Sequence, residues 1–177
     1  MLPNHFTASD VDAANLGMLL MRMGFGVTLA AHGYNKFFGG GRIPGTARWF
    51  DSMGMRPGKV HAVLAASTEM GAGILLALGL LTPLACAGFV ALMIVAAYTV
   101  HLKNGFFIVK SGWEYNWILA LAAVCIATIG PYKYSLDYPL GIAFRFNGIS
   151  GLLIALLVGV GGAALQLGIF YRPPKDA

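Results

Sequence analysis

The chain of 177 residues is 58% hydrophobic and only 11% charged, and its formal net charge is +5. A soluble domain of this size carries roughly 25% charged residues, so this chain lacks the polar surface that water would require, and lipid is the expected solvent. The positive charge is not interleaved with aromatic residues on a polar background, which argues against a nucleic-acid-binding protein and favours basic loops at an anionic membrane surface.

Five apolar segments follow a polar amino-terminal tail, residues 1–15. Each is near the ~20 residues that cross a ~30 Å hydrocarbon layer, and in lipid a helix is the structure that satisfies its own backbone hydrogen bonds. The expected transmembrane helices are 16–34, 60–81, 84–102, 114–129 and 149–170. The sequence therefore predicts an all-α, integral membrane helical bundle.

The connections between these segments differ in length and charge. Thr82 and Pro83 form a tight break, so the second and third segments are expected to make an antiparallel hairpin. The loop 35–59 is longer and carries most of the charge, and its stretch 46–54 is expected to form a short interfacial helix.

Lys and Arg are distributed unequally between the two faces that five spans define. Of the 12, five lie in the loop 35–59, two lie between the third and fourth segments, and two follow the fifth, all on one face. The positive-inside rule then places the amino terminus outside and the carboxyl terminus in the cytoplasm.

Arg22 and Glu69 lie inside expected spans, where a charge costs ~3 kcal/mol. Glu69 shares a stripe of four-residue spacing with Ala65, Gly73 and Ala77, and small residues of this kind favour close helix contact. Two interpretations stay open. In the first, Arg22 and Glu69 form a buried ion pair or are hydrogen-bonded groups that fix the packing. In the second, Glu69 handles protons or substrate.

Further polar residues are expected to gather at the basic face, because the first and third segments end there and the second and fourth begin there. They are His32, Lys36, His101, Asn104, Glu114 and Tyr115. Such a set could handle protons or polar headgroups, with Glu69, His101 and His32 as the candidates for a catalytic role. Boundary lysines and aromatic residues also act as plain anchors. No metal site is predicted, because these residues fit no strict ligand spacing.

Two smaller features concern helix contacts. Cys86 and Cys125 are expected at similar depth near the outer face, where they could meet, although apolar burial is the usual fate of a free cysteine. The last segment carries a ridge of small residues at four-residue intervals: Gly151, Ala155, Gly159 and Ala163. This ridge seals the helix to the others or mediates an oligomer.

Four blocks of the chain resemble, in order, the successive blocks of the DoxX family of small bacterial membrane proteins. They are "LLMRMGFGVTLAAHGYNKFFG", "ARWFDSMGM", "ASTEMGAGILLALGLLTPLA" and "TVHLKNGFFIVKSGWEYNWILA". The resemblance covers residues 16–137 and implies a four-helix membrane core there, with 138–177 as an additional transmembrane helix and short basic tail. The motif positions are Arg22, His32, Gly33, Lys36, Glu69, His101, Asn104, Gly105, Phe106, Phe107, Glu114 and Tyr115.

The resemblance also implies a redox association. The related DoxD subunit belongs to a thiosulfate:quinone oxidoreductase, and DoxX proteins are linked to membrane oxidoreductase complexes that handle thiol and oxidative stress. We therefore expect a subunit of the bacterial inner membrane that has no intrinsic cofactor and binds quinone or another lipidic small molecule. The residues expected at this ligand are those of the boundary set, together with Arg22, Glu69, Phe106 and Phe107.

In this hypothesis a soluble or membrane redox protein supplies the electrons and docks on the basic loop 35–59. Two alternatives from other classes stay open. One is an assembly or scaffold subunit without chemistry. The other is a transporter of a small or lipidic substrate, for which a homo-oligomer would supply the second half that a single chain without inverted repeats lacks.

Overall fold

The computed structural model describes residues 7–173, and over this range the chain is a bundle of helices with no β-strand. The helices are α1 (Ala8–Phe38), α2 (Arg42–Ser52), α3 (Gly58–Leu78), α4 (Thr82–Ala96), α5 (Glu114–Ile129) and α6 (Ile149–Phe170). A π-helical turn, Ala97–His101, and a 3-10 turn, Leu102–Asn104, extend α4, and a second 3-10 turn covers Ile108–Lys110. The predicted all-α class is confirmed.

Four helices are long and apolar enough to cross a membrane: α1, α3, α6 and the extended α4, which runs from Thr82 to Asn104. The bounds of α5 and α6 agree with the predicted segments 114–129 and 149–170. Helix α5 has 16 residues, which at 1.5 Å per residue gives about 24 Å, somewhat short of the hydrocarbon layer. Helix α2 contains most of the predicted interfacial segment 46–54.

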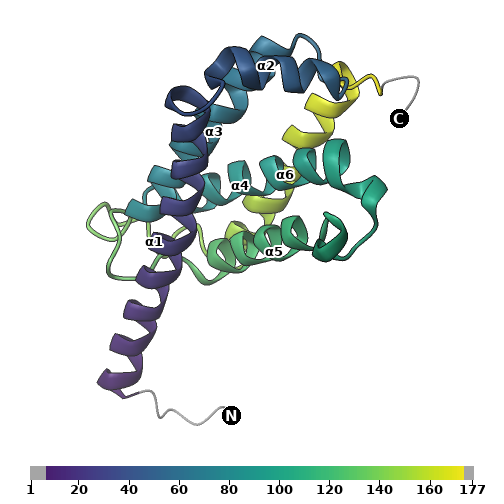
Figure 1. Cartoon of the computed structure of the whole chain (residues 1–177). Helices are drawn as coiled ribbons and strands as arrows, with labels where there is room; N and C mark the ends of the chain where they lie inside the picture. Colours follow the sequence, from purple (N-terminus) through teal and green to yellow (C-terminus); the bar gives the residue numbers. More distant parts are fainter. Residues whose placement is uncertain (1–6, 174–177) are drawn as a thin grey trace.

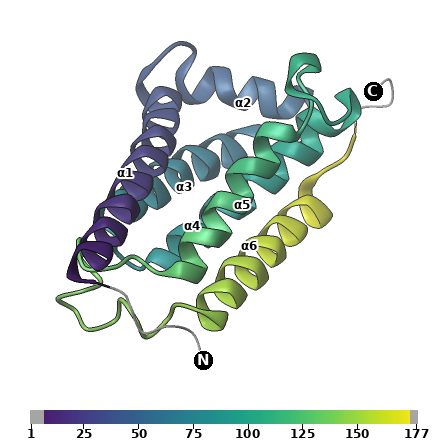
Figure 2. The ribbon, with the colours of Figure 1, turned by 90° about the horizontal axis from the view of Figure 1, so that it is seen from below.

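The helices form two groups that meet at α4 (Figure 1, Figure 2). Helix α1 packs along α3, and α2 lies across the end of this pair. Helix α4 contacts α3 on one side and α5 and α6 on the other. A tight turn at residues 79–81 joins α3 to α4, so the predicted hairpin is present. Its turn lies just before the predicted break, because Thr82 and Pro83 form the first turn of α4.

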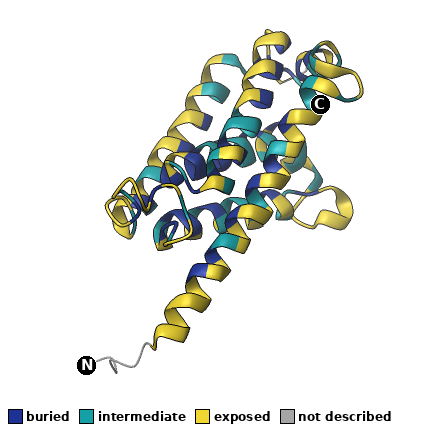
Figure 3. Cartoon of the chain, turned by 90° about the vertical axis from the view of Figure 1, so that its left-hand side faces the viewer, coloured by how far each residue is buried: buried dark blue, intermediate teal, exposed yellow. Residues whose placement is uncertain are grey.

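Helix α1 begins eight residues before the predicted segment 16–34. Thr7 and Asp10 form a capping box at its start, in which the Thr7 hydroxyl accepts a hydrogen bond from the Asp10 amide and the Asp10 carboxylate accepts one from the Thr7 amide. The first turns of α1 are exposed and project beyond the bundle (Figure 3). Apolarity alone could not locate this start, because the cap lies outside the apolar segment.

Glycine brings α1 and α3 into backbone contact. A Cβ added at Gly26 would overlap the backbone of Gly73 and Ala77, and one added at Gly73 would overlap the backbone of Gly26 and Ala30. The small-residue stripe predicted on α3 is therefore the surface that receives α1.

The small-residue ridge of α6 also faces inward. The buried residues of this helix are Gly151, Ala155, Gly159 and Ala163. Gly151 lies against the carbonyl of Ala127 in α5, and Gly159 lies against Ala87 and Val90 in α4. Of the two roles predicted for the ridge, sealing α6 to the bundle is confirmed.

Candidate functional site

Lys36 of α1 and Glu69 of α3 form an ion pair between the two helices. The Lys36 Nζ donates to Glu69 Oε1 at 2.7 Å and to Oε2 at 2.6 Å. The Lys36 side chain is 20% exposed and the Glu69 side chain is 12% exposed, so both are mostly buried. It is the only salt bridge between residues that the structure describes.

Gly33 explains why this pair can form. A Cβ at Gly33 would overlap the backbone of Ala66 and Met70, which flank Glu69 on α3. The two helix axes therefore approach closely at this level. Lys36 lies nearly one turn after Gly33, so its side chain reaches the carboxylate without a bend in α1.

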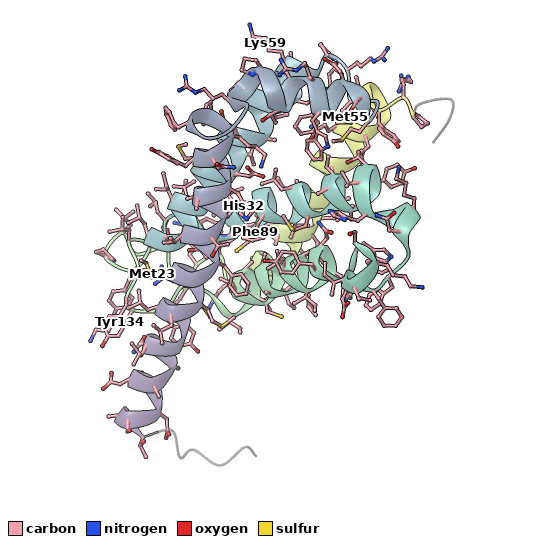
Figure 4. The ribbon with its side chains drawn as sticks, in the orientation of Figure 1. Met23, His32, Met55, Lys59, Phe89 and Tyr134 are labelled. Atoms are coloured by element: carbon pink, nitrogen blue, oxygen red, sulfur yellow. The ribbon has the colours of Figure 1, made fainter. Side chains whose placement is uncertain are left out.

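Glu69 lines a cavity of about 410 Å³ between α1 and α5, which we call the lateral groove. Its polar lining is formed by Thr28 and His32 of α1, Glu69 of α3, and Tyr115 and Asn116 of α5. Its apolar lining is formed by Leu20, Met21, Gly24, Phe25, Leu29, Phe89, Met93 and Leu119. His32 and Phe89 lie close together at the groove in Figure 4.

The groove opens on the outer surface of the bundle, because α1 packs on α3 whereas α5 packs on α4 and α6. Leu20 is 63% exposed and Tyr115 is 52% exposed, although both line the groove. Because apolar residues of this surface are exposed, a lipidic molecule could enter between α1 and α5. On a mostly apolar wall it would meet a carboxylate, an imidazole, a phenol, an amide and the Thr28 hydroxyl.

The predicted site residues after α4 form hydrogen bonds with the backbone of their own loop and so stabilise it. His101 Nδ1 donates to the Ser111 carbonyl at 2.8 Å, and Asn104 Nδ2 donates to the same oxygen at 3.1 Å. The Glu114 carboxylate accepts a hydrogen bond from the Ile108 amide at 2.9 Å. None of these three lines the lateral groove.

Phe106 and Phe107 also lie outside the groove. The Phe106 ring packs edge-on against Trp113 with a centroid distance of 4.9 Å, and Phe107 is 62% exposed. Of the predicted boundary set, Lys36 contacts Glu69, and His32 and Tyr115 line the same cavity as Glu69, whereas the loop residues lie apart.

Comparisons with known proteins indicate the family of this chain. The DoxX family model matches residues 17–102, which contain the ion pair and His32. A protein of Bacillus subtilis (strain 168) named "Putative oxidoreductase CatD" is 33% identical over 122 residues, which are 69% of this chain and 85% of that protein. The chain belongs to the DoxX family. No solved structure matches this DoxX chain.

With its membership of the DoxX family and its long apolar helices, the chain is a multi-pass membrane protein. The family match begins in α1 and ends in the 3-10 turn after α4. Tyr115 and Asn116 of α5 therefore lie beyond the part of the DoxX chain that the family model matches.

Arg22 of the DoxX chain forms its hydrogen bonds at the other end of α3, away from the Lys36–Glu69 pair. Its side chain is fully buried and donates to the carbonyls of Leu76, Ala77 and Tyr134. It thus ties the end of α3 to the loop between α5 and α6. Of the two interpretations for this charge, a hydrogen-bonded group that fixes packing is the one that the geometry favours, and its partners are carbonyls rather than Glu69.

Sequence reasoning missed Asp137, which lies in the same buried region. Its carboxylate accepts hydrogen bonds from the amides of Leu81 and Thr82 at 2.8 and 3.0 Å, and from the Thr82 hydroxyl at 2.8 Å. It caps the start of α4 and supplies the negative charge near Arg22. The sequence signal for such a role was a single carboxylate in the tyrosine-rich loop between α5 and α6.

Asn116 was missed for a different reason. It follows Tyr115 in the first turn of α5, is 7% exposed and lies in the groove wall near Met93. A polar amide buried within an expected span was the signal for it. The two cysteines do not pair: Cys86 is buried in the core, whereas Cys125 is exposed.

Proposed function

We propose that the chain is the membrane subunit of a redox-associated assembly and binds a quinone in the lateral groove. The observation that carries this proposal is that Glu69, which Lys36 holds in an ion pair, lines the same cavity as His32 and Tyr115. The name of the Bacillus subtilis relative, which describes an oxidoreductase, supports the redox association.

The groove suits a quinone in chemistry and in access. A quinone headgroup is a flat ring with two carbonyl oxygens that accept hydrogen bonds. Tyr115, Asn116 and His32 supply donors, while Phe25 and Phe89 supply aromatic walls. The isoprenoid tail would leave between α1 and α5 toward the acyl chains. A cavity of about 410 Å³ is within the range of sites for small organic ligands.

Reduction of a quinone to a quinol consumes two electrons and two protons. In the proposal the electrons come from a redox protein bound to the chain, which itself needs no intrinsic cofactor. The proton-carrying groups at the ligand are His32 and Glu69, and Lys36 donates to the Glu69 carboxylate. In the reverse reaction the two protons of the quinol return to these groups, and its two electrons return to the redox protein.

The same proposal places the chain in the bacterial inner membrane with its amino terminus outside and its carboxyl terminus in the cytoplasm. The basic residues near α2 would then face the cytoplasm. Arg42, Arg48, Arg56 and Lys59 are all exposed there, and this positive surface would attract an acidic redox partner. Lys59 lies at the edge of this surface in Figure 4.

The test is the quinone content of the purified protein in lipid nanodiscs, measured by extraction and mass spectrometry. Gly24 lines the groove, and a side chain added there meets no other atom nearby, so Gly24→Leu fills the groove without disturbing the helix. Gly17, one heptad earlier on α1, is equally open but lies outside the groove, so Gly17→Leu is the matched control.

We expect about one quinone per chain in the wild type and in Gly17→Leu, and little in Gly24→Leu. Absence of quinone from the wild type, together with normal activity of the assembly when Glu69 is replaced by Gln, would identify a scaffold subunit instead. Equal quinone content in the two glycine variants would show that quinone does not bind in the lateral groove.

A further inference from the structure

A second cavity, of about 380 Å³, lies beneath α2 and is separate from the lateral groove. We call it the α2 chamber. Its walls come from α2, α3, α4 and α6, and include Phe50, Leu64, Leu92, Val95 and Gly162. It shares Glu69 and Met93 with the lateral groove, so these residues form the partition between the two.

A third cavity, of about 400 Å³, adjoins the chamber, and we call it the vestibule. The two share Trp49, Met53, Thr99 and Val100, so they lie on either side of one wall. The vestibule is more polar, because it is lined by hydroxyl groups and by Lys103. A largely apolar space beneath α2 thus lies next to a polar space near the ends of α4 and α6.

The charges in these two cavities point to an anion. Among residues 7–173, Lys103 is the charged side chain that lines the vestibule, and no carboxylate lies beside it. The chamber holds Lys36 and Glu69, but these neutralise each other. Among the described residues, the uncompensated charge is therefore the Lys103 ammonium group at the polar end, where the Tyr98 and Tyr171 hydroxyls can add hydrogen bonds.

The wall shared by chamber and vestibule is formed in part by the π-helical turn Ala97–His101. Thr99 in this turn is buried and donates its hydroxyl to the Val95 carbonyl at 2.8 Å. π-Helical turns inside longer helices are rare and occur frequently at functional sites, where the extra residue displaces the helix wall. Its position at this junction is independent of the charge argument and supports a binding site.

We propose that the chamber and the vestibule together bind a single-chain anionic amphiphile. The anionic head lies beside Lys103 in the vestibule, and the apolar chain extends into the chamber toward Glu69. The two cavities have the size of sites for small organic ligands, which favours one chain over the two of a complete phospholipid. This site does not depend on the quinone groove.

The experiment measures binding of oleate to the purified protein by native mass spectrometry and titration. Gly162 lines the chamber, and a side chain added there meets no neighbouring atom, so Gly162→Leu fills the chamber. Gly161 is equally open and exposed but does not line it, so Gly161→Leu is the control. Lys103→Gln removes the charge, and Lys110→Gln is the control on the same loop, because Lys110 is exposed outside the cavities.

We expect one oleate per chain in the wild type and in Gly161→Leu, and loss of binding in Gly162→Leu. Lys103→Gln should weaken binding about fivefold, the factor typical of a partly exposed ion pair, whereas Lys110→Gln should not. Because Lys103 is on the surface, this variant tests the site even if Gly162→Leu fails to fold.

Two further probes distinguish the sources of the anion. Displacement of oleate by lysophosphatidylglycerol would identify a phosphate headgroup, and failure of displacement would identify a carboxylate; either result supports the site. Uncharged monoolein should bind more weakly than oleate. Equal binding of monoolein and oleate, or unchanged oleate binding in both Gly162→Leu and Lys103→Gln, would overturn the proposal.

Discussion

Lys36 and Glu69 are 33 residues apart in the chain, yet the Lys36 Nζ contacts both oxygens of the Glu69 carboxylate at 2.7 and 2.6 Å. The Glu69 side chain also lines two cavities, one on each side of it. A single ion pair thus holds α1 to α3 and forms part of the partition between the lateral groove and the α2 chamber.

Because Lys36 and Glu69 are paired, we expect replacement of one residue to destabilise the protein more than replacement of both. Replacing Glu69 by Gln leaves the Lys36 ammonium without its counter-charge, and we expect a loss of about 2 kcal/mol in the free energy of unfolding. Replacing both residues, as Lys36→Met with Glu69→Leu, should restore most of it. Thermal unfolding in detergent checks this, with a Tm decrease of about 4–8 °C for the single variant. A double variant no more stable than the single one would contradict the paired description.

We expect replacement of Arg22 to lower the free energy of unfolding more than replacement of Glu69 does, and to leave ligand binding unchanged. Arg22→Met removes the donor to three carbonyls and leaves the buried Asp137 without its nearby positive charge, and we expect a loss of about 3 kcal/mol. Lys133→Met is the control, because Lys133 is exposed in the same loop. Chemical unfolding followed by circular dichroism measures both. Equal midpoints for the two variants would show that Arg22 does not hold this end of the bundle.

The glycine contacts of α1 predict opposite outcomes for the same substitution at two positions. Gly26→Ala places a methyl group into the α3 backbone and should separate the helices, with a loss of several kcal/mol or failure to fold. Gly17→Ala meets nothing and should be neutral or stabilising by up to ~1 kcal/mol, because alanine favours a helix. Tm values of the two variants decide this, and a stable Gly26→Ala would contradict the close approach of α1 and α3.

The groove predicts a measurable contribution from the Tyr115 hydroxyl. Tyr115→Phe keeps the ring and removes one donor, and we expect the affinity for a short-chain ubiquinone to fall about fivefold to tenfold. Tyr134→Phe is the control, because Tyr134 lies in the loop at the other end of the bundle (Figure 4). Titration in nanodiscs gives both dissociation constants, and equal values would exclude the hydroxyl from the ligand.

Hydropathy was sufficient to predict the positions of the apolar helices and of a short helix in the loop 35–59, because each depends on local composition. The ridge ending at Ala163 and the stripe around Gly73 were also recognisable, since four-residue spacing defines a helix face whatever the helix packs against. The start of α1 at Ala8 was missed because a hydrogen-bonded cap, rather than apolarity, determines it.

The site was only partly predictable. That Glu69 pairs with Lys36 rather than with Arg22 depends on where the α1 and α3 backbones meet, which Gly33 determines in three dimensions. Lys36 was counted as a loop residue, although α1 continues through Phe38. His101 and Asn104 lie in the turns that follow α4, and the path of the chain there directs both toward the Ser111 carbonyl instead of the groove.

The most direct measurement is photolabelling of the protein in nanodiscs with an azido-quinone, followed by mass spectrometry of the labelled peptides. Labels on both α1, between Leu20 and His32, and α5, between Tyr115 and Leu119, would place the headgroup in the lateral groove. Labelling there should disappear in Gly24→Leu and persist in Gly17→Leu. Labels confined to the exposed surface of α6, or unchanged by Gly24→Leu, would contradict a quinone site between α1 and α5.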